Sequence, residues 1–199
     1  MLSTITRPEI TMPTGACEVV APIADYNDVP INRAIQRVYQ RGGGSVYLLA
    51  QKYKTRAAIR LLPKVHLCGS TGLFSCNMGT FNTDGAISLG KVTLDGNGTR
   101  IIKNCNDYAI ECVGVSGTEI VGAGLRNLTV TRAAADTNDK YLVNLYFADR
   151  FSMSDVCADD AYSSAIYINY CDKKTCQDIL KRGKREEHQD GFIENLKIV

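Results

Sequence analysis

The sequence lacks several features that would assign it to a common functional class. Its net charge is only +2, so no overall charge attracts it to nucleic acid or to an anionic membrane. No apolar run approaches the ~20 residues that a membrane-spanning helix needs. The first ten residues contain no basic region followed by an apolar core, so we predict no secretory signal. We therefore expect no nucleic-acid partner and no membrane insertion.

Metal ligands are also sparse. The chain has two histidines, and its eight cysteines include no C-x-x-C pair, because even Cys171 and Cys176 are five positions apart. We therefore predict no zinc site and no cofactor. The cysteines could form disulfides, but a chain of 199 residues with a repetitive apolar core does not need them. We expect mostly free thiols, several of them packed inside as small apolar side chains.

What the sequence does contain is one hydrophobic phrase, repeated five times. Each copy has two apolar residues separated by one residue, which is typical of a strand with one face inward, and another apolar residue three positions before the first of them. This spacing fits a short strand, a bend and a second strand. The copies are Leu62-x-x-Val65-x-Leu67, Leu89-x-x-Val92-x-Leu94, Leu125-x-x-Leu128-x-Val130, Met153-x-x-Val156-x-Ala158 and Ile193-x-x-Leu196-x-Ile198.

The spacing of the copies predicts a stacked repeat. Their first residues are 27, 36, 28 and 40 positions apart, in the range of roughly 20 to 50 residues that is typical of solenoids. The two longer intervals then contain insertions, which usually build a binding face. A second apolar series lies between the phrases, as expected if each coil has more than one inward strand. Its members are Ala109-Ile110, Val143-Leu145 and Ile166-Ile168.

A helix is predicted before the repeats, over about residues 29–41. Its apolar residues Ile31, Ala34, Ile35, Val38 and Tyr39 follow the spacing of one helix face. Asp28 is the expected N-cap, and Gly42 follows the last apolar residue, where glycine most easily adopts the left-handed conformation that ends a helix. Such a helix would cover the apolar end of a solenoid.

These residues resemble a known family. The stretch from Asp28 to Gly69, with its short helix, glycine run and Val46-Tyr47-Leu48 strand, is similar to the opening of pectate-lyase-like right-handed parallel β-helix proteins. Within that group the chain most resembles bacteriophage tailspike and tail-fibre proteins. The resemblance implies an all-β fold, a right-handed parallel β-helix (β-solenoid) with an N-terminal amphipathic capping helix. It also implies polysaccharide as a ligand, since the group includes polysaccharide lyases and hydrolases.

The expected organisation is an N-terminal arm or attachment segment over residues 1–24 and a β-helix over residues 25–199. The chain ends at Val199 inside the fifth apolar phrase, with no polar cap after it. A solenoid that stopped there would leave unpaired backbone and apolar surface. We therefore expect the chain to be a portion of something longer, or its open end to be covered by another subunit.

Two acidic places are candidate catalytic sites. Asp159 and Asp160 follow the fourth phrase, and glycoside hydrolysis commonly needs two carboxylates on either side of a bond. His188 and Asp190 precede the fifth phrase and share a face if the segment is extended, so they could act as an acid/base pair. The alternative in both places is structural, because acidic residues also terminate strands and form turns.

A basic interval near the C-terminus is the candidate substrate-binding region. Its cations could meet an acidic polysaccharide, and the alternative is a solvated surface loop. Tyr162, Tyr167 and Tyr170 lie nearby, where tyrosines can stack on sugar rings or pack partly in the core. The cations are Lys173, Lys174, Lys181, Arg182, Lys184 and Arg185.

Three functions fit these observations. The first is a virion-type tail spike or fibre component that binds, and in one version degrades, host cell-surface glycan, with copies of itself or other virion proteins as partners. The second is a stand-alone extracellular polysaccharide lyase or glycoside hydrolase. The third is a purely structural trimeric shaft. The sequence does not decide whether the protein is an enzyme.

Overall fold

The computed structural model describes residues 15–70, 98–138, 140–159 and 166–172. The second and fifth phrases lie outside these residues. The elements in chain order are β1 (Ala16–Val20), α1 (Asp28–Gln40), β2 (Gly44–Leu48), β3 (Lys52–Thr55), β4 (Ile59–Arg60), β5 (Val65–Cys68), β6 (Arg100–Lys103), β7 (Ile110–Val113), β8 (Ile120–Val121), β9 (Gly124–Arg132), β10 (Val143–Tyr146), β11 (Ala148–Asp149), β12 (Ser152–Asp159) and β13 (Ile166–Asn169).

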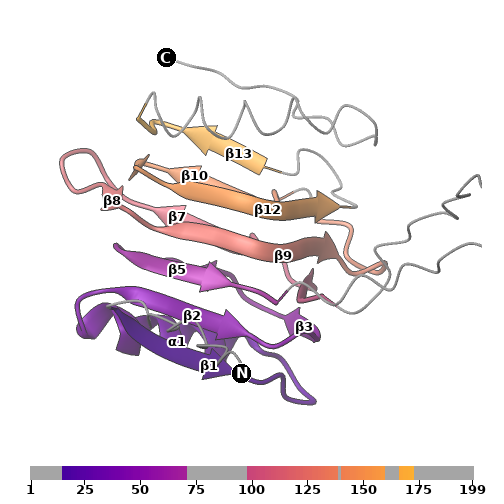
Figure 1. The fold of residues 1–199 in the computed structure, drawn as a ribbon. Helices are drawn as coiled ribbons and strands as arrows, with labels where there is room; N and C mark the ends of the chain where they lie inside the picture. Colours follow the sequence, from indigo (N-terminus) through magenta and orange to yellow (C-terminus); the bar gives the residue numbers. More distant parts are fainter. Residues whose placement is uncertain (1–14, 71–97, 139, 160–165, 173–199) are drawn as a thin grey trace, which may run out of the picture.

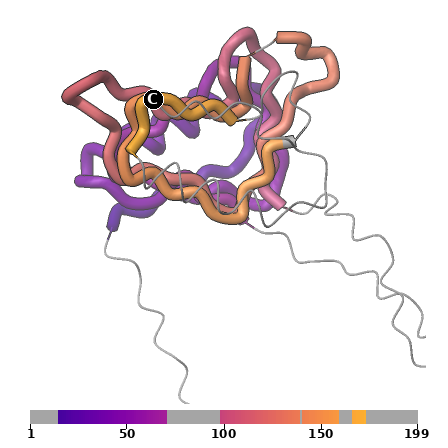
Figure 2. Tube along the Cα trace, turned by 90° about the horizontal axis from the view of Figure 1, so that it is seen from above, coloured from indigo at the N-terminus to yellow at the C-terminus, as the bar shows by residue number. Residues whose placement is uncertain are grey.

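The strands form three sheets, and each pairing between these strands is parallel. The large sheet has the order β1-β2-β5-β9-β6-β3, with β12 also paired to β9. A second sheet has the order β13-β10-β7-β4, and β11 pairs with β8. Figure 1 shows the strands stacked in layers, and Figure 2 shows the sheets curling around a common core.

The second apolar series forms the second sheet, as the sequence predicts. Ile110, Val143 and Ile166 are register partners across β7, β10 and β13. Two residues further along each strand, Cys112, Leu145 and Ile168 form a parallel row, and all three are buried. The alternation of apolar residues therefore places one full face of this sheet against the core.

Helix α1 confirms the predicted helix, with a shift of one residue at each end. Its side chains Ile31, Ala34, Ile35 and Val38 are buried and belong to the same core as the strands. The N-cap is Asn27 rather than the expected Asp28. Asp28 instead lies at the first helical position, buried, where its carboxylate accepts a hydrogen bond from the Arg56 amide at 3.1 Å.

The repeated phrase does produce a bend at its third residue. Lys64, Asn127 and Asp155 occupy this position in the three described copies, and all have positive φ, of 60°, 52° and 53°. Asn and Asp tolerate the left-handed conformation better than most residues, which suits them to such bends. The third and fourth phrases stack in register, with Leu125 opposite Met153.

The first phrase stacks in a different register. Leu67, its last apolar residue, pairs with Leu125, the first apolar residue of the third phrase. This register arises because the bend at Lys64 lies beside Gly122 and not beside Asn127. The Lys64 amide donates a hydrogen bond to the carbonyl of Val121, and the Gly122 amide donates one to the carbonyl of Asp149. Phrases with the same spacing therefore lie at two different bends of the chain. Strand β9 pairs with β5 along its first half and with β6 along its second.

The fold class predicted from the sequence, an all-β right-handed parallel β-helix, is wrong. The structure is 11% helical and 47% strand, and its parallel sheets form a curled half-barrel with one helix, which is a mixed, α/β-like arrangement. The prediction assumed that phrases with the same spacing stack in the same register, as successive coils around a core that strands alone build. The first phrase does not stack in that way, and α1 supplies part of the core itself.

Candidate functional site

Nearly all the site residues predicted from the sequence lie outside the residues that the structure describes. Asp159 is the last residue of β12, where its Cα is paired with that of Thr131, and its side chain is not among those described. The structure therefore does not show a constellation of the predicted residues. Those outside the described part are Asp160, Tyr162, Lys173, Lys174, Arg182, Arg185, His188 and Asp190.

Two other acids of this region, one before and one after Asp159 in the sequence, have structural roles. Asp155 is exposed and forms the bend of β12. The carboxylate of Asp172 accepts a hydrogen bond from the Arg150 amide at 2.6 Å, where Arg150 itself has positive φ. For Asp172 the geometry supports the structural interpretation, a carboxylate that shapes a turn, whereas Asp155 shapes its bend through its backbone conformation.

The described tyrosines of this region pack against other rings. Tyr167 stacks on Tyr141 with centroids 4.6 Å apart, and Tyr141 stacks in turn on Tyr108 at 6.3 Å. Tyr170 stacks on Phe147 at 4.9 Å, although it remains 53% exposed. One face of each ring is thus occupied by protein, so these rings serve first as packing between successive strands.

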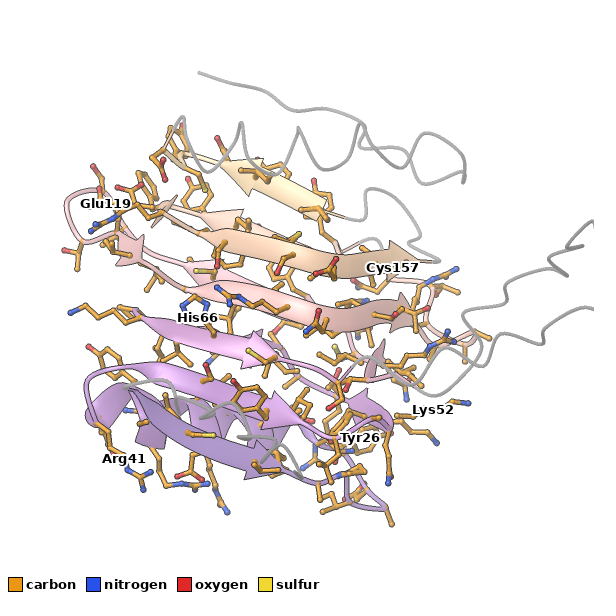
Figure 3. All side chains as sticks on the ribbon, viewed as in Figure 1. Tyr26, Arg41, Lys52, His66, Glu119 and Cys157 are labelled. Carbon is orange, nitrogen blue, oxygen red and sulfur yellow. The ribbon has the colours of Figure 1, made fainter. Side chains whose placement is uncertain are left out.

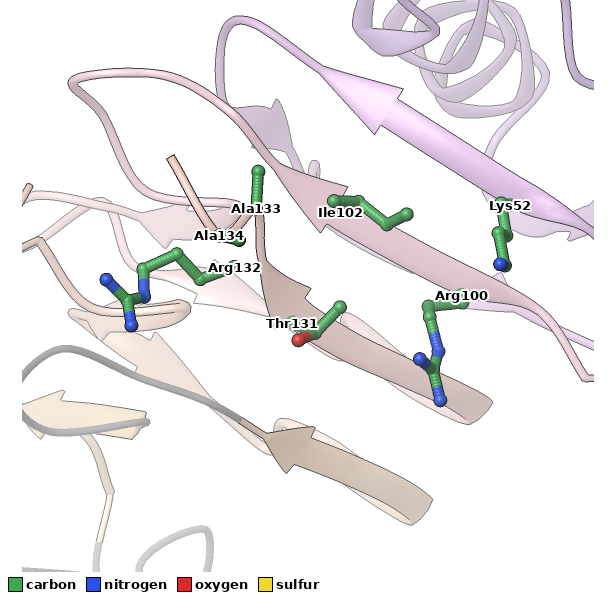
Figure 4. Close-up of a pocket in the computed structure, with 7 residues that line it drawn as sticks. All are labelled: Lys52, Arg100, Ile102, Thr131, Arg132, Ala133 and Ala134. Atoms are coloured by element: carbon green, nitrogen blue, oxygen red, sulfur yellow. The ribbon is translucent and has the colours of Figure 1, made fainter. Parts of the chain in front are cut away.

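A shallow, open basic groove on the outer face of the large sheet is the candidate site that the described residues offer. It has a volume of about 630 Å³ and lies over β3, β6 and the end of β9 (Figure 4). The lining residues are Lys52, Arg100, Ile102, Thr131, Arg132, Ala133 and Ala134.

Strand register places two cations of the groove side by side. Lys52 is the Cα partner of Arg100 on adjacent parallel strands, and Ile102 is the partner of Thr131. Alternation explains why these residues face outward: Tyr53 and Ile101, which follow the two cations in sequence, are fully buried in the core. Like charges opposite each other on one sheet face repel, so this arrangement costs stability.

The described residues that line the groove include no acid. Within the described part of the chain, neither Lys52 nor Arg100 forms an ion pair with a carboxylate. Arg132 differs, since its guanidinium donates to the backbone carbonyl of Asp136. The groove therefore presents positive charge that an anionic ligand would offset, together with apolar side chains.

Sequence reasoning missed this groove. The signal was present in part, because Lys52 and Lys54 alternate with buried residues in one strand, and Arg100 precedes an apolar pair in another. Lys52 and Arg100 are 48 positions apart in the sequence. Periodicity within a strand does not show which distant strand becomes its neighbour, so it could not bring the two cations together.

A second polar cluster lies on β5, β9 and β12. His66 (Figure 3) and Ser152 flank Gly124, and their buried Nδ1 and Oγ atoms have no hydrogen-bond partner among the described residues. Burial lowers the pKa of His66, and the charge of Arg126 lowers it further. A Cβ at Gly124 would lie 2.3 Å from Ser152 Oγ and 2.6 Å from His66 Nδ1, so the space holds no additional atom. This cluster is therefore close packing and not a ligand site.

The cysteines follow the prediction where the structure describes them. Cys17, Cys68, Cys105 and Cys112 are free thiols, as expected for these four. Burial raises the pKa of the Cys112 thiol well above its usual range. In residues 15–70, 98–138, 140–159 and 166–172, no three His, Cys, Asp or Glu side chains gather in a way that could hold a metal ion. The same ranges contain no helix suited to crossing a bilayer.

Comparisons with known proteins do not assign the chain. No protein family matches the sequence, and neither curated proteins nor solved structures gave a match. The resemblance to pectate-lyase-like proteins therefore stays an untested prediction, while the β-helix that it implied is corrected by the structure.

Proposed function

We propose that the protein binds an acidic glycan in the basic groove over β3, β6 and β9. The observation that supports this proposal best is the register pair of Lys52 and Arg100, two like charges side by side with no acid among the described lining residues. Repulsion between them is relieved when a carboxylate or sulfate group binds between them. A uronic acid or a sulfated sugar carries such a group.

The uncharged part of the groove suits the rest of a sugar ring. Ile102, Ala133 and Ala134 offer apolar contact, whereas Thr131, which also belongs to the lining, is only 9% exposed. The groove lies on the outer face of a sheet (Figure 4), where an extended chain can lie across several strands. These features support a polymer more than a small anion.

The proposal is for binding and not for cleavage. Glycoside hydrolysis commonly needs a pair of carboxylates flanking the bond, and the described residues of the groove lining supply none. The predicted catalytic residues Asp160, His188 and Asp190 lie outside the described part of the chain. A lyase or hydrolase activity therefore stays a prediction.

The biological setting is also a prediction. A host cell-surface glycan, further copies of the chain and other virion proteins remain the expected partners, and the virion or the extracellular space the expected location. The tailspike and tail-fibre likeness no longer supports this setting, because it depended on a parallel β-helix, and the structure has parallel sheets in a curled half-barrel instead.

Isothermal titration calorimetry with two oligosaccharides of equal length tests the proposal, one made of uronic acids and one neutral. We expect the parent protein to bind the acidic one, and its affinity to fall as salt screens the charges. Arg100→Gln should weaken this binding about fivefold, since a partly exposed ion pair contributes about 1 kcal/mol. Lys52→Gln should weaken it by a similar factor.

Arg33→Gln is the matched control. Arg33 is exposed on α1, a helix that contacts mainly β1, β2, β4 and β5, so this variant removes the same charge and should bind like the parent. Equal loss in Arg33→Gln and Arg100→Gln would show a general charge effect and contradict a groove. If the parent bound single-stranded DNA as tightly as the acidic oligosaccharide, the ligand would be a nucleic acid and not a glycan.

A further inference from the structure

The wall of the basic groove at the end of β9 is a turn held from the neighbouring strand. Ala133 and Ala134 form this wall, and the Ala133 amide donates to the carbonyl of Lys103 at 2.7 Å. The Asp136 amide then donates back to the carbonyl of Ala133 at 2.9 Å. The shape of the wall thus depends on residues 133–138.

A buried ion pair closes this turn. Lys103 Nζ lies 2.6 Å from Asp136 Oδ2, and the two side chains are 0% and 4% exposed. The other carboxylate oxygen of Asp136 accepts the Asn138 amide at 2.9 Å. The Asp136 carbonyl accepts a hydrogen bond from Arg132, which also lines the groove. One aspartate therefore connects β6, the groove wall and a groove cation.

We propose that Lys103 and Asp136 are positioning residues that set the shape of the groove for its ligand. The inference rests on the proposed function, in that the ligand is the acidic glycan. A buried charge left without its partner is strongly destabilising, so the pair allows few other arrangements of the turn. The carboxylate also neutralises Lys103, and this cation adds little to the field of the groove.

The positioning role of the pair and its effect on the charge of the groove predict opposite results for Asp136→Asn. If the pair acted on the groove through charge alone, removing the carboxylate would leave Lys103 uncompensated and strengthen the binding of an anion. If the pair positions the wall, the variant weakens binding although the groove becomes more positive. The sign of the change in affinity therefore separates positioning from simple electrostatics.

The experiment combines calorimetry with hydrogen exchange, both at a temperature where each variant is fully folded. For Asp136→Asn we expect the affinity for the uronic-acid oligosaccharide to fall about tenfold. This loss is smaller than the destabilisation that breaking a buried ion pair can cause. The amides of Ala133, Asp136 and Asn138 should exchange on the order of a hundredfold faster without ligand. A role in global stability alone would leave the affinity of the folded protein unchanged.

Two further variants keep the test decisive. Glu119→Gln, in a turn far from Lys52 in Figure 3, also replaces a carboxylate by an amide and should leave the groove amides and the affinity unchanged. If Asp136→Asn does not fold, Lys103→Met with Asp136→Leu removes both charges and leaves neither unpaired. This double variant should fold, exchange faster at Asn138 and bind more weakly.

Each outcome bears on the proposal. Unchanged exchange at residues 133–138, unchanged affinity, or tighter binding by Asp136→Asn would overturn positioning. If the parent binds no acidic oligosaccharide, the proposed function fails, while the exchange measurement still decides whether the pair holds the turn. Faster exchange with unaltered affinity would leave the proposed function standing and refute only the inference about the pair.

Discussion

Two basic regions of the molecule are organised in opposite ways. Arg37 of α1 and Arg41, the C-cap residue of this helix, both contact Glu18 of β1, with nitrogen–oxygen distances of 3.2 and 3.0 Å. The hydrogen bond from Arg37 is the main reason that the pKa of Glu18 lies below its usual value. In the groove, Lys52 and Arg100 lie side by side without an acid among the described lining residues.

The difference shows which cations serve the fold and which are available to a ligand. Glu18 joins β1 to α1, so its contacts with the two arginines connect two elements of the structure. The charges of Lys52 and Arg100 connect nothing within the described part of the chain and only repel each other. Charge that is uncompensated in the free protein is the stronger sign of a binding surface.

The largest effect is expected where the α1 region supports the core. Ile35 is 1% exposed and packs with the strands, so Ile35→Asp would bury an unpaired charge. We expect a loss of about 3–5 kcal/mol in the free energy of unfolding, measured by urea denaturation. Gln36→Asp, on the exposed face of the same helix, is the control and should change stability little. A parent-like midpoint for Ile35→Asp would show that α1 does not seal this core.

A smaller effect is expected on the sheet face between the two regions. Gly124→Ala places a Cβ within 3 Å of His66 and Ser152 side-chain atoms. Overpacking of this kind costs about 1–3 kcal/mol. Gly117→Ala serves as a comparison, because open space surrounds that position and any loss there arises from its positive φ of 81°. Thermal unfolding checks both, and an unperturbed Gly124→Ala would show that the space between β5 and β12 can widen.

The next prediction concerns pH. The pKa of His66 is lowered in the folded protein by burial and by Arg126, so the unfolded chain takes up a proton more readily. Stability should therefore be retained above the unfolded pKa of about 6.5 and fall as the pH drops below it, towards the folded pKa. Urea denaturation at a series of pH values checks this slope. His66→Gln should reduce the dependence of the free energy of unfolding on pH. An unchanged dependence in that variant would assign it to other groups.

The smallest effect is expected from breaking the exposed ion pairs. Glu18→Gln removes both contacts with Arg37 and Arg41, and exposed pairs contribute little to stability. Because the folded pKa of Glu18 is lowered, its contribution is present above the unfolded pKa and is lost as the pH falls through the folded one. We expect a small fall in midpoint at neutral pH and none in strong acid. A midpoint loss as large as that of Ile35→Asp would show that these pairs hold the fold.

Several elements were predictable because their signals are local. The helix stripe of Ile31 to Val38 needs only the 3.6-residue period, and the bends at Asn127 and Asp155 need only the phrase around them, although their left-handed conformation is known from the structure. The rows through Val143 and Leu145 follow from alternation. The fold class was not predictable in this way, because the register of Leu67 against Leu125 depends on which corners stack.

The candidate site shows the same division. Strand alternation in the sequence puts Lys52 and Arg100 on outward faces, and composition puts a modest positive charge on the chain. Only the tertiary structure decides that β3 lies beside β6, which joins two cations 48 positions apart, and that Asp136 neutralises Lys103 and not its neighbours. The physical reason is range: backbone periodicity acts over a few residues, whereas pairing of strands and of charges depends on the packing of the whole core.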